Sequence, residues 1–243
     1  MQIARQDVTV AEIAANSLAA VRVFEKYGID YCCGGKRPLA EVCRKNGEDP
    51  EKILAEVEAA LAGFEGTQRD WNTAPLRELT RHIVSVHHAY LWNELPAIQA
   101  RLDKVYRVYN QRYGPSLIGL PEAYADLRSE LELHMRKEER ILFPAIEAAE
   151  ASHTAAPFLA APIHVMEAEH ESAGLALGRI REITQDFTVP EYGCVTYQAL
   201  MRSLAELEQD LHLHIHLENN ILFPRTQQLS GAGTKADGPA GCR

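Results

Sequence analysis

The chain has 243 residues, of which 46 % are hydrophobic and 24 % are charged, and its formal charge is −9 at pH 7. This length and balance predict a globular protein of one or two domains. The negative charge disfavours nucleic acid as a main partner, because that binding depends on neutralising phosphates. No apolar run reaches the roughly 18 residues that a membrane span requires, so no membrane partner is expected.

The N-terminus and the cysteines indicate where the protein works. The first residues, MQIARQDVTVAEIAANS, lack the basic start and apolar core of a secretory signal. The five cysteines are odd in number and show no framework spacing, which is typical of a reducing compartment. The sequence therefore predicts a cytoplasmic protein.

The first part of the chain is predicted to form short helices. Thr9 and Glu12 have the spacing of a capping box at a helix start. Gly28 is well placed to end a second helix, and Pro50 is suited to the first position of a third. A polar stretch with two glycines and a proline, residues 63–75, then predicts a domain boundary.

Beyond this boundary the sequence predicts four long helices, with Gly and Pro in the breaks between them. They cover roughly residues 75–112, 121–150, 160–186 and 191–228. Four such helices with short connections predict an antiparallel bundle. The expected fold class is therefore all-α, with a small helical domain over 1–66, a four-helix bundle over 67–228 and a disordered tail over 229–243.

Two of the predicted long helices contain copies of one motif. LHMRKEERILFP and LHIHLENNILFP share leucine, histidine, glutamate and the closing ILFP at an offset of 80 residues. Each copy places a histidine four residues before a glutamate, which puts both on one helical face: His134 with Glu138, and His214 with Glu218. A carboxylate on an apolar buried face is costly unless a cation or a hydrogen-bonding partner meets it. The duplicated pair therefore predicts a metal site.

Apolar stripes select the remaining histidines. His170 lies in the middle of a stripe at helical spacing, and His88 continues such a stripe where its neighbour His87 falls on a mixed face. Around the first motif, the same spacing predicts that Ile141 and Ala145 face the core. Each half of the repeat then contributes one lone histidine and one His-Glu pair. The six predicted ligands are His88, His134, Glu138, His170, His214 and Glu218.

This ligand set predicts which metal is bound. Histidine and carboxylate without thiolate disfavour a structural zinc site and suit iron or manganese. Six ligands and a two-fold repeat imply two ions, and bridging glutamates would fill about eight of roughly twelve coordination positions. Glu130, one turn before His134, and Glu169, beside His170, are candidates for an acid or base outside the ligand set; solvated helix charges are the alternative reading.

The stretch YCCGGK puts Cys32 and Cys33 side by side, before two glycines. A disulfide between neighbours is strained, and strained disulfides are the redox-active kind. Structural zinc is disfavoured because no second cysteine pair is available. Two readings stay open: incidental thiols in a turn, or a candidate catalytic pair that touches a partner's iron or sulfur or exchanges electrons with the bundle.

These motifs carry a family resemblance. Residues 76–226, with VMEAEHESAG and HLENNILFPR, resemble a hemerythrin-like His-His-Glu bundle with a non-haem di-iron centre. Residues 5–62, with YGIDYCCGGKRPLAEVC, are similar to the N-terminal domain of the RIC (repair of iron centres) family, the di-iron proteins of iron–sulfur cluster repair. The resemblance implies two iron ions at the same six residues, with Glu138 and Glu218 as bridging carboxylates. Met166 stands where oxygen-carrying hemerythrins have an additional histidine, which disfavours reversible oxygen carriage.

The resemblance also implies a function: the repair of iron–sulfur clusters damaged by nitric oxide or oxidative stress. Repair would proceed by iron donation, or by binding and reduction of nitric oxide, and the sequence leaves open whether the protein is an enzyme. The expected partners are damaged iron–sulfur proteins and small diatomic ligands, and a homodimer is one open oligomeric state. The main alternative is a hemerythrin-like sensor or carrier of oxygen or nitric oxide. A di-iron oxidase or peroxidase is a third reading, for which no organic-substrate motif is present.

Overall fold

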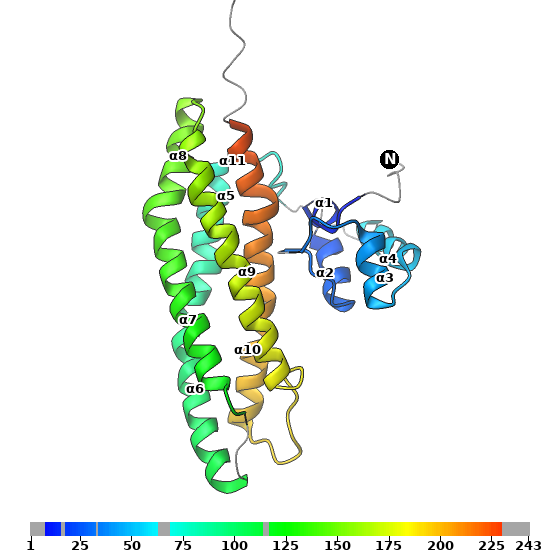
Figure 1. Ribbon diagram of the computed structural model, residues 1–243, viewed down its shortest axis with the longest axis vertical. Coiled ribbons are helices and arrows are strands. Elements are labelled where there is room, and N and C mark those ends of the chain that lie inside the picture. The colour runs from blue at the N-terminus through cyan, green and yellow to red at the C-terminus, as the bar shows by residue number, and fades with distance from the viewer. Residues whose placement is uncertain (1–7, 16–17, 33, 63–68, 114–116, 230–243) are drawn as a thin grey trace, which may run out of the picture.

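The computed structural model describes residues 8–15, 18–32, 34–62, 69–113 and 117–229, and within these ranges the protein is all-α, as predicted (Figure 1). The described residues form no strand, and their single β-type pairing is an isolated bridge between Thr9 and Pro38. None of the described helices combines the length and apolarity needed to cross a bilayer.

The N-terminal part consists of four short helices. They are α1 (Val10–Ala15), α2 (Leu18–Lys26), α3 (Leu39–Asn46) and α4 (Pro50–Ala62). The predicted capping box forms, since Glu12 Oε2 accepts the Thr9 backbone N–H at 2.9 Å and Thr9 Oγ1 accepts the Glu12 N–H at 3.2 Å. Gly28 follows α2 with φ of +60°, a conformation that glycine adopts without strain. The sequence analysis did not single out α3.

The C-terminal part is built from four long helical runs, which we call rods 1 to 4. Rod 1 comprises α5 (Leu76–Ile83), the π turn η1 (Val84–His88) and α6 (Ala89–Tyr113). Rod 2 comprises α7 (Leu120–Lys137), the π turn η2 (Glu138–Leu142) and α8 (Phe143–Ser152). A 3₁₀ turn η3 (Pro157–Leu159) leads into rod 3, α9 (Ala160–Ile183). Rod 4 comprises α10 (Val195–Leu217), the π turn η4 (Glu218–Leu222) and α11 (Phe223–Leu229). Successive rods run in opposite directions (Figure 1).

The π turns correct one prediction. A π turn adds a residue to the helix, so the face after it is rotated by about 100°. Ile141, expected to face the core, is therefore 65 % exposed, and Leu142 is buried in its place at 3 % exposure. The expectation was wrong because it assumed an unbroken α-helical period through residues 138–142.

The bundle core is divided into two layers, with the predicted ligands between them. On one side lie side chains such as Leu91, Leu131 and Leu211, and on the other lie Ile83 and Leu142. Along every rod the predicted ligands fall between residues of the first layer and residues of the second. The rods are thus held together above and below a polar layer, which keeps bulk water away from it.

The small helical domain docks on the bundle beside this polar layer (Figure 1). Helix α1 contacts α10 and η4, and Ile215 of α10 packs into the domain's own apolar core. Asn220 Nδ2 donates a hydrogen bond to the Tyr31 carbonyl at 2.9 Å, and the Tyr31 ring meets His216 edge-on at 5.5 Å between centroids. The predicted boundary after residue 66 falls within residues 63–68, which lie outside the described ranges. Of the predicted tail over 229–243, Leu229 is the last residue of α11, and residues 230–243 lie outside the described ranges.

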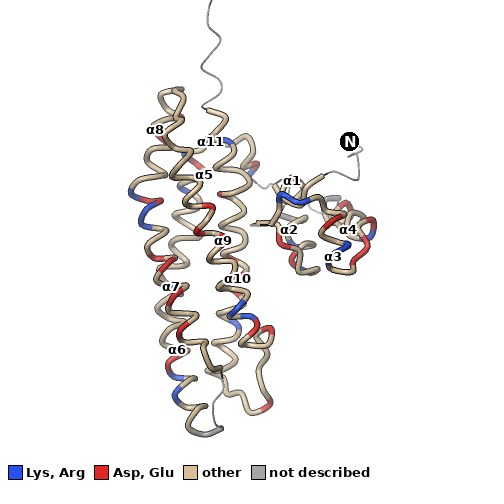
Figure 2. The backbone as a smooth tube through the Cα atoms, viewed as in Figure 1, with Lys and Arg blue, Asp and Glu red and all other residues tan. Residues whose placement is uncertain are grey.

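Charged residues of both signs are interspersed over the two parts of the chain (Figure 2). Lys36 of the small domain pairs with Glu167 of α9 at 3.3 Å, but Lys36 is largely exposed, so this pair adds little stability. The buried contact of Ile215 and the part-buried hydrogen bond of Asn220 therefore contribute more to the docking than this ion pair does.

Candidate metal centre

The six predicted ligands converge on one buried place in the bundle. They form two groups of four ligand atoms that lie within 4.8 Å of one another: His88, Glu138, His214 and Glu218, and His134, Glu138, His170 and Glu218. Both groups share the two glutamates, so a cation at each position would have two histidines of its own. The π turns contribute to this convergence, because η1 ends at His88 while η2 and η4 begin at Glu138 and Glu218.

The histidines meet through their Nε2 atoms. His88 Nε2 lies 3.2 Å from His214 Nε2, and His134 Nε2 lies 3.1 Å from His170 Nε2. The Nδ1 atoms of His88 and His134 donate to carboxylates, so Nε2 is the nitrogen of each ring that can bind a metal ion in place of a proton. Two neighbouring ligand atoms of an octahedral ion, with bonds of about 2.1 Å, lie about 3.0 Å apart. The Nε2 separations thus suit a metal ion at each position.

The carboxylates also lack a full set of partners. Glu138 Oε2 lies 3.2 Å from His134 Nε2 and 3.4 Å from His88 Nε2. Even so, neither oxygen of Glu138 makes a well-aligned hydrogen bond with the described residues, and the same holds for Oε2 of Glu218. Burial opposes ionisation of Glu218, but His214 and His170 outweigh it and hold its pKa well below the usual range. Two ionised, fully buried and under-bonded carboxylates fit a bound cation.

Behind the ligands, other side chains orient three of the four imidazoles. The contacts are His88 Nδ1 to Glu139 Oε1 at 3.0 Å, His134 Nδ1 to Glu169 Oε2 at 2.9 Å, and His170 Nδ1 to Asn219 Oδ1 at 2.8 Å. Such contacts fix the ring and increase its basicity as a ligand. Although burial opposes protonation of His134, Glu138 and Glu169 raise its pKa to about 10.

The fourth imidazole is an exception. His214 Nδ1 is buried and has no hydrogen-bond partner among the described residues, and burial lowers the pKa of His214. The ring beside it is that of His87, which lies parallel to it at 5.5 Å between centroids and 8° between planes. His87 is itself buried, and its Nδ1 is 2.9 Å from Asp210 Oδ1.

The sequence analysis did not identify three of these orienting residues, Glu139, Asn219 and Asp210. A signal was available for two of them, since Glu139 and Asn219 directly follow the ligand glutamates and match each other at the 80-residue offset. Of the two residues proposed outside the ligand set, Glu169 contacts His134, whereas Glu130 touches no ligand imidazole. Glu130 is exposed, accepts a hydrogen bond from Ser172 at 3.1 Å and lines the entrance of a small cavity.

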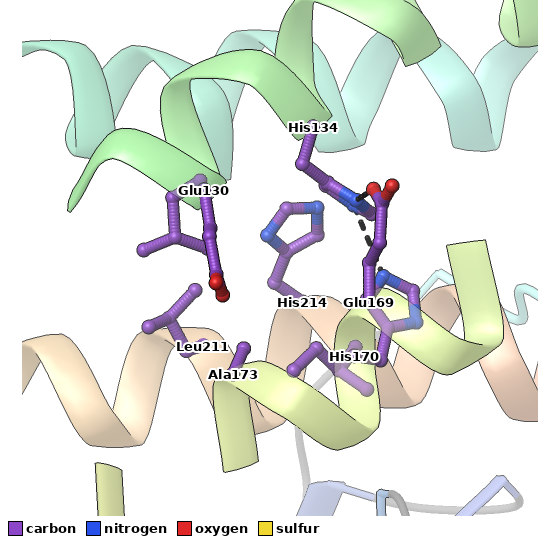
Figure 3. Close-up of a pocket in the computed structure, with 9 residues that line it drawn as sticks. Glu130, His134, Glu169, His170, Ala173, Leu211 and His214 are labelled. Atoms are coloured by element: carbon purple, nitrogen blue, oxygen red, sulfur yellow. Dashed lines mark hydrogen bonds and ion pairs between the residues drawn. The ribbon is translucent and has the colours of Figure 1, made fainter. Parts of the chain in front are cut away.

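Figure 3 shows this cavity, toward which the rings of His134, His170 and His214 point. It encloses about 20 Å³, and its apolar wall is formed by Leu131, Ala173, Leu211 and Ile215. A cavity needs about 10–15 Å³ to hold one water molecule. The space beside the ligands is therefore sized for water or a diatomic molecule.

Cys32 lies in the connection between α2 and α3 and is 5 % exposed, while Cys33 lies outside the described residues. The Cys32 Sγ is 3.4 Å from Asp30 Oδ1. Asp30 and Cys32 also line a groove of about 480 Å³ between the small domain and the bundle, together with Glu208 and His212 of α10. This groove lies at the junction of the small domain and the bundle.

Comparison with known proteins identifies both parts of the chain. Residues 6–61 match the family model described as "Domain of Unknown function (DUF542)", and residues 79–226 match the "Hemerythrin HHE cation binding domain". Proteins named "Iron-sulfur cluster repair protein YtfE" are similar along most of their length. The protein of Escherichia coli O157:H7 is 40 % identical over 223 residues, 91 % of this chain and 97 % of the relative. The protein of Edwardsiella ictaluri is 40 % identical over 223 residues, 90 % of this chain and 96 % of the relative.

The order of the two domains, the cation-binding bundle and the identity over nearly the whole length all agree with the resemblance of the cysteine and His-Glu motifs. The chain belongs to the RIC family of iron–sulfur cluster repair proteins.

Proposed function

We propose that this protein restores iron–sulfur clusters damaged by nitric oxide or oxidative stress in the cytoplasm, using two non-haem irons held in the bundle. The observation that carries the proposal is the pair of four-residue groups that share Glu138 and Glu218. Support also comes from the relatives, whose printed names describe iron–sulfur cluster repair.

In this proposal, His88 and His214 would hold one iron and His134 and His170 the other, and Glu138 and Glu218 would serve both. Two ferrous ions there would supply exchangeable iron and open coordination positions for nitric oxide. The residues themselves fix the imidazoles through Glu139, Glu169 and Asn219. Histidine and carboxylate retain ferrous iron less firmly than thiolates retain soft metals, which makes transfer to another protein feasible.

The thiol pair would serve the damaged cluster. Cys32 is close to the groove between the domains, so a partner that entered the groove could bring its iron or sulfur to this thiol. The Cys32 thiol is buried in the free protein, and such contact would require the partner to open the connection between α2 and α3.

A second candidate function is a sensor or carrier of nitric oxide or oxygen without repair activity. The cavity of about 20 Å³ beside the ligand histidines favours it, because this space is enough for a water-sized ligand. Retention of both irons on mixing with a protein that has lost its cluster would support this alternative.

The test is repair of a hydratase whose iron–sulfur cluster has been destroyed by nitric oxide, after addition of the iron-loaded protein. The variants are His134→Ala, and Cys32→Ser combined with Cys33→Ser. The matched controls are His153→Ala and Cys194→Ser, which alter exposed residues of the same kinds.

The proposal expects the unmodified protein and both controls to restore hydratase activity, and His134→Ala, which lacks a ligand at one of the two positions, to restore less of it. If the unmodified protein restores nothing, the repair function is wrong. If restoration survives both His134→Ala and the double cysteine substitution, the proposed residues are wrong.

A further inference from the structure

The two metal positions differ in how their histidines are supported. At the position of His134 and His170, both Nδ1 atoms have an acceptor, the Glu169 carboxylate and the Asn219 amide. At the other position, His88 has Glu139, and His214 Nδ1 has no partner among the described residues. The two positions therefore hold their ions with unequal ligand support.

The internal repeat shows which kind of supporting group His214 lacks. Glu169 directly precedes the lone ligand His170 of the second half, and it supports the paired histidine of the first half, His134. The residue that precedes the lone ligand of the first half is His87, and it lies beside the paired histidine of the second half, His214. An imidazole thus takes the place that the repeat elsewhere gives to a carboxylate.

His87 does not support His214 in the way that Glu169 supports His134. Its Nδ1 is 2.9 Å from Asp210 Oδ1, so this nitrogen carries a proton and donates to the carboxylate. Its Nε2 is buried and without a partner among the described side chains, just as His214 Nδ1 is. His87 therefore does not give His214 the oxygen acceptor that Glu169 gives to His134 and Asn219 gives to His170.

At the position of His88 and His214, the carboxylate that contacts His88 also accepts a second hydrogen bond. Glu139 Oε1 accepts both the His88 contact and a hydrogen bond from Trp92 Nε1 at 3.2 Å. Glu169 instead uses separate oxygens for His134 and for Lys137. The two positions therefore differ chiefly at His214, since His88, His134 and His170 each have an oxygen acceptor at Nδ1.

We propose that the iron held by His88 and His214 is the one that leaves first, and that His87 is the positioning residue that makes it labile. This inference rests on the proposed function as an iron donor and says which of the two irons is donated. Loss of one such supporting contact changes metal affinity by about 10- to 100-fold. The protein would then keep one firmly bound iron while it delivers the other.

The test is the release of ferrous iron from the anaerobically loaded protein to a chromophoric ferrous chelator. Two phases are expected, each of about one iron per chain, with rates about tenfold apart or more. In His88→Ala the iron that remains should leave at the slow rate, and in His170→Ala it should leave at the fast rate. The opposite assignment would overturn the proposal.

Substitutions at the orienting residues test His87 itself. His87→Gln and His87→Glu offer His214 a carbonyl or carboxylate acceptor and should slow the fast phase, whereas Glu169→Gln should accelerate the slow phase. His153→Gln, at an exposed histidine, should change neither phase. A fast phase that keeps its rate in folded His87→Gln and His87→Glu would show that His87 does not set the lability.

The unmodified protein alone also decides the question. If it binds two irons and repairs clusters but releases both in a single phase, this inference fails and the proposed function stands. If it binds fewer than two irons, the proposed di-iron function itself fails.

Discussion

His88 and His214 face each other through their Nε2 atoms at 3.2 Å, although 126 positions separate them in the chain. The two side chains come from different rods, since His88 ends the π turn of rod 1 and His214 lies one turn before the π turn of rod 4. Only the packing of these rods brings the two nitrogens together. This separation matches that of two neighbouring ligands of one metal ion, and Glu138 and Glu218 complete the group, so the contact marks a position for a metal ion.

Metal binding should therefore stabilise the fold. A ligand at 100 times its dissociation constant adds about 2.7 kcal/mol to the free energy of unfolding. We expect removal of iron with a chelator to lower the melting temperature measured by circular dichroism, and re-addition of ferrous iron to restore it. His134→Ala should contain about half the iron of the unmodified protein, measured by elemental analysis. Equal melting temperatures with and without iron would contradict the metal site.

The layer of core below the site should carry much of the bundle's stability. Leu207 is fully buried, and Leu207→Ala should lower the free energy of unfolding by about 2–5 kcal/mol because it leaves a cavity. Leu175 is 79 % exposed, and Leu175→Ala should change it by less than about 0.5 kcal/mol. Urea denaturation of both variants measures the difference, and similar losses would show that the core is placed incorrectly.

Docking of the small domain should depend on Asn220. Its side-chain N–H₂ reaches the Tyr31 carbonyl, and Asn220→Ala leaves this partly buried acceptor without its donor at a cost of about 1–3 kcal/mol. Hydrogen exchange at the backbone amides around Tyr31 should become faster. Asn93→Ala is the matched control, since that exposed amide bonds only within its own helix turn to the Ala89 carbonyl. Unchanged exchange in Asn220→Ala would mean that the docking does not use this contact.

Cys194 should be an unusually reactive thiol. It precedes α10 at its N-terminus, and the Tyr109 hydroxyl together with the backbone N–H groups of Tyr197 and Thr196 lowers its pKa to about 7. The thiolate is the reactive form, so alkylation of Cys194 should rise with pH and reach half its maximum near pH 7 rather than at about 8.5.

Peptide mass spectrometry can follow this alkylation separately from the other cysteines. Tyr109→Phe removes the hydroxyl and should move the midpoint to higher pH. A midpoint that stays near 8.5 in the unmodified protein would show that Tyr109 and the helix terminus do not stabilise the thiolate.

Much of the architecture could be predicted from local patterns. The four rods follow from apolar spacing, which is a property of each segment alone, and the stripe through His170 is buried as expected. The repeated His-x-x-x-Glu motif indicated four of the residues that the structure brings together, and the apolar stripes indicated His88 and His170, because a costly polar group on an apolar face must meet partners from other helices.

Two of the failures, at Ile141 and His87, share one physical origin. A π turn has no apolar signature of its own, and its extra residue rotates everything after it. Ile141 is exposed for this reason, and His87, which a regular helix would leave on a mixed face, is buried beside His214.

By itself, the sequence determined an all-α protein with four long helices and a duplicated His-Glu motif, since helical periodicity and the cost of burying charge act within short segments. Only the tertiary structure decided which nitrogen of each histidine faces the centre, which imidazole lacks a supporting acceptor, and where Cys32 lies against the bundle. These are distances between rods and domains far apart in the chain, and the packing of the two core layers and the docking of the small domain set them.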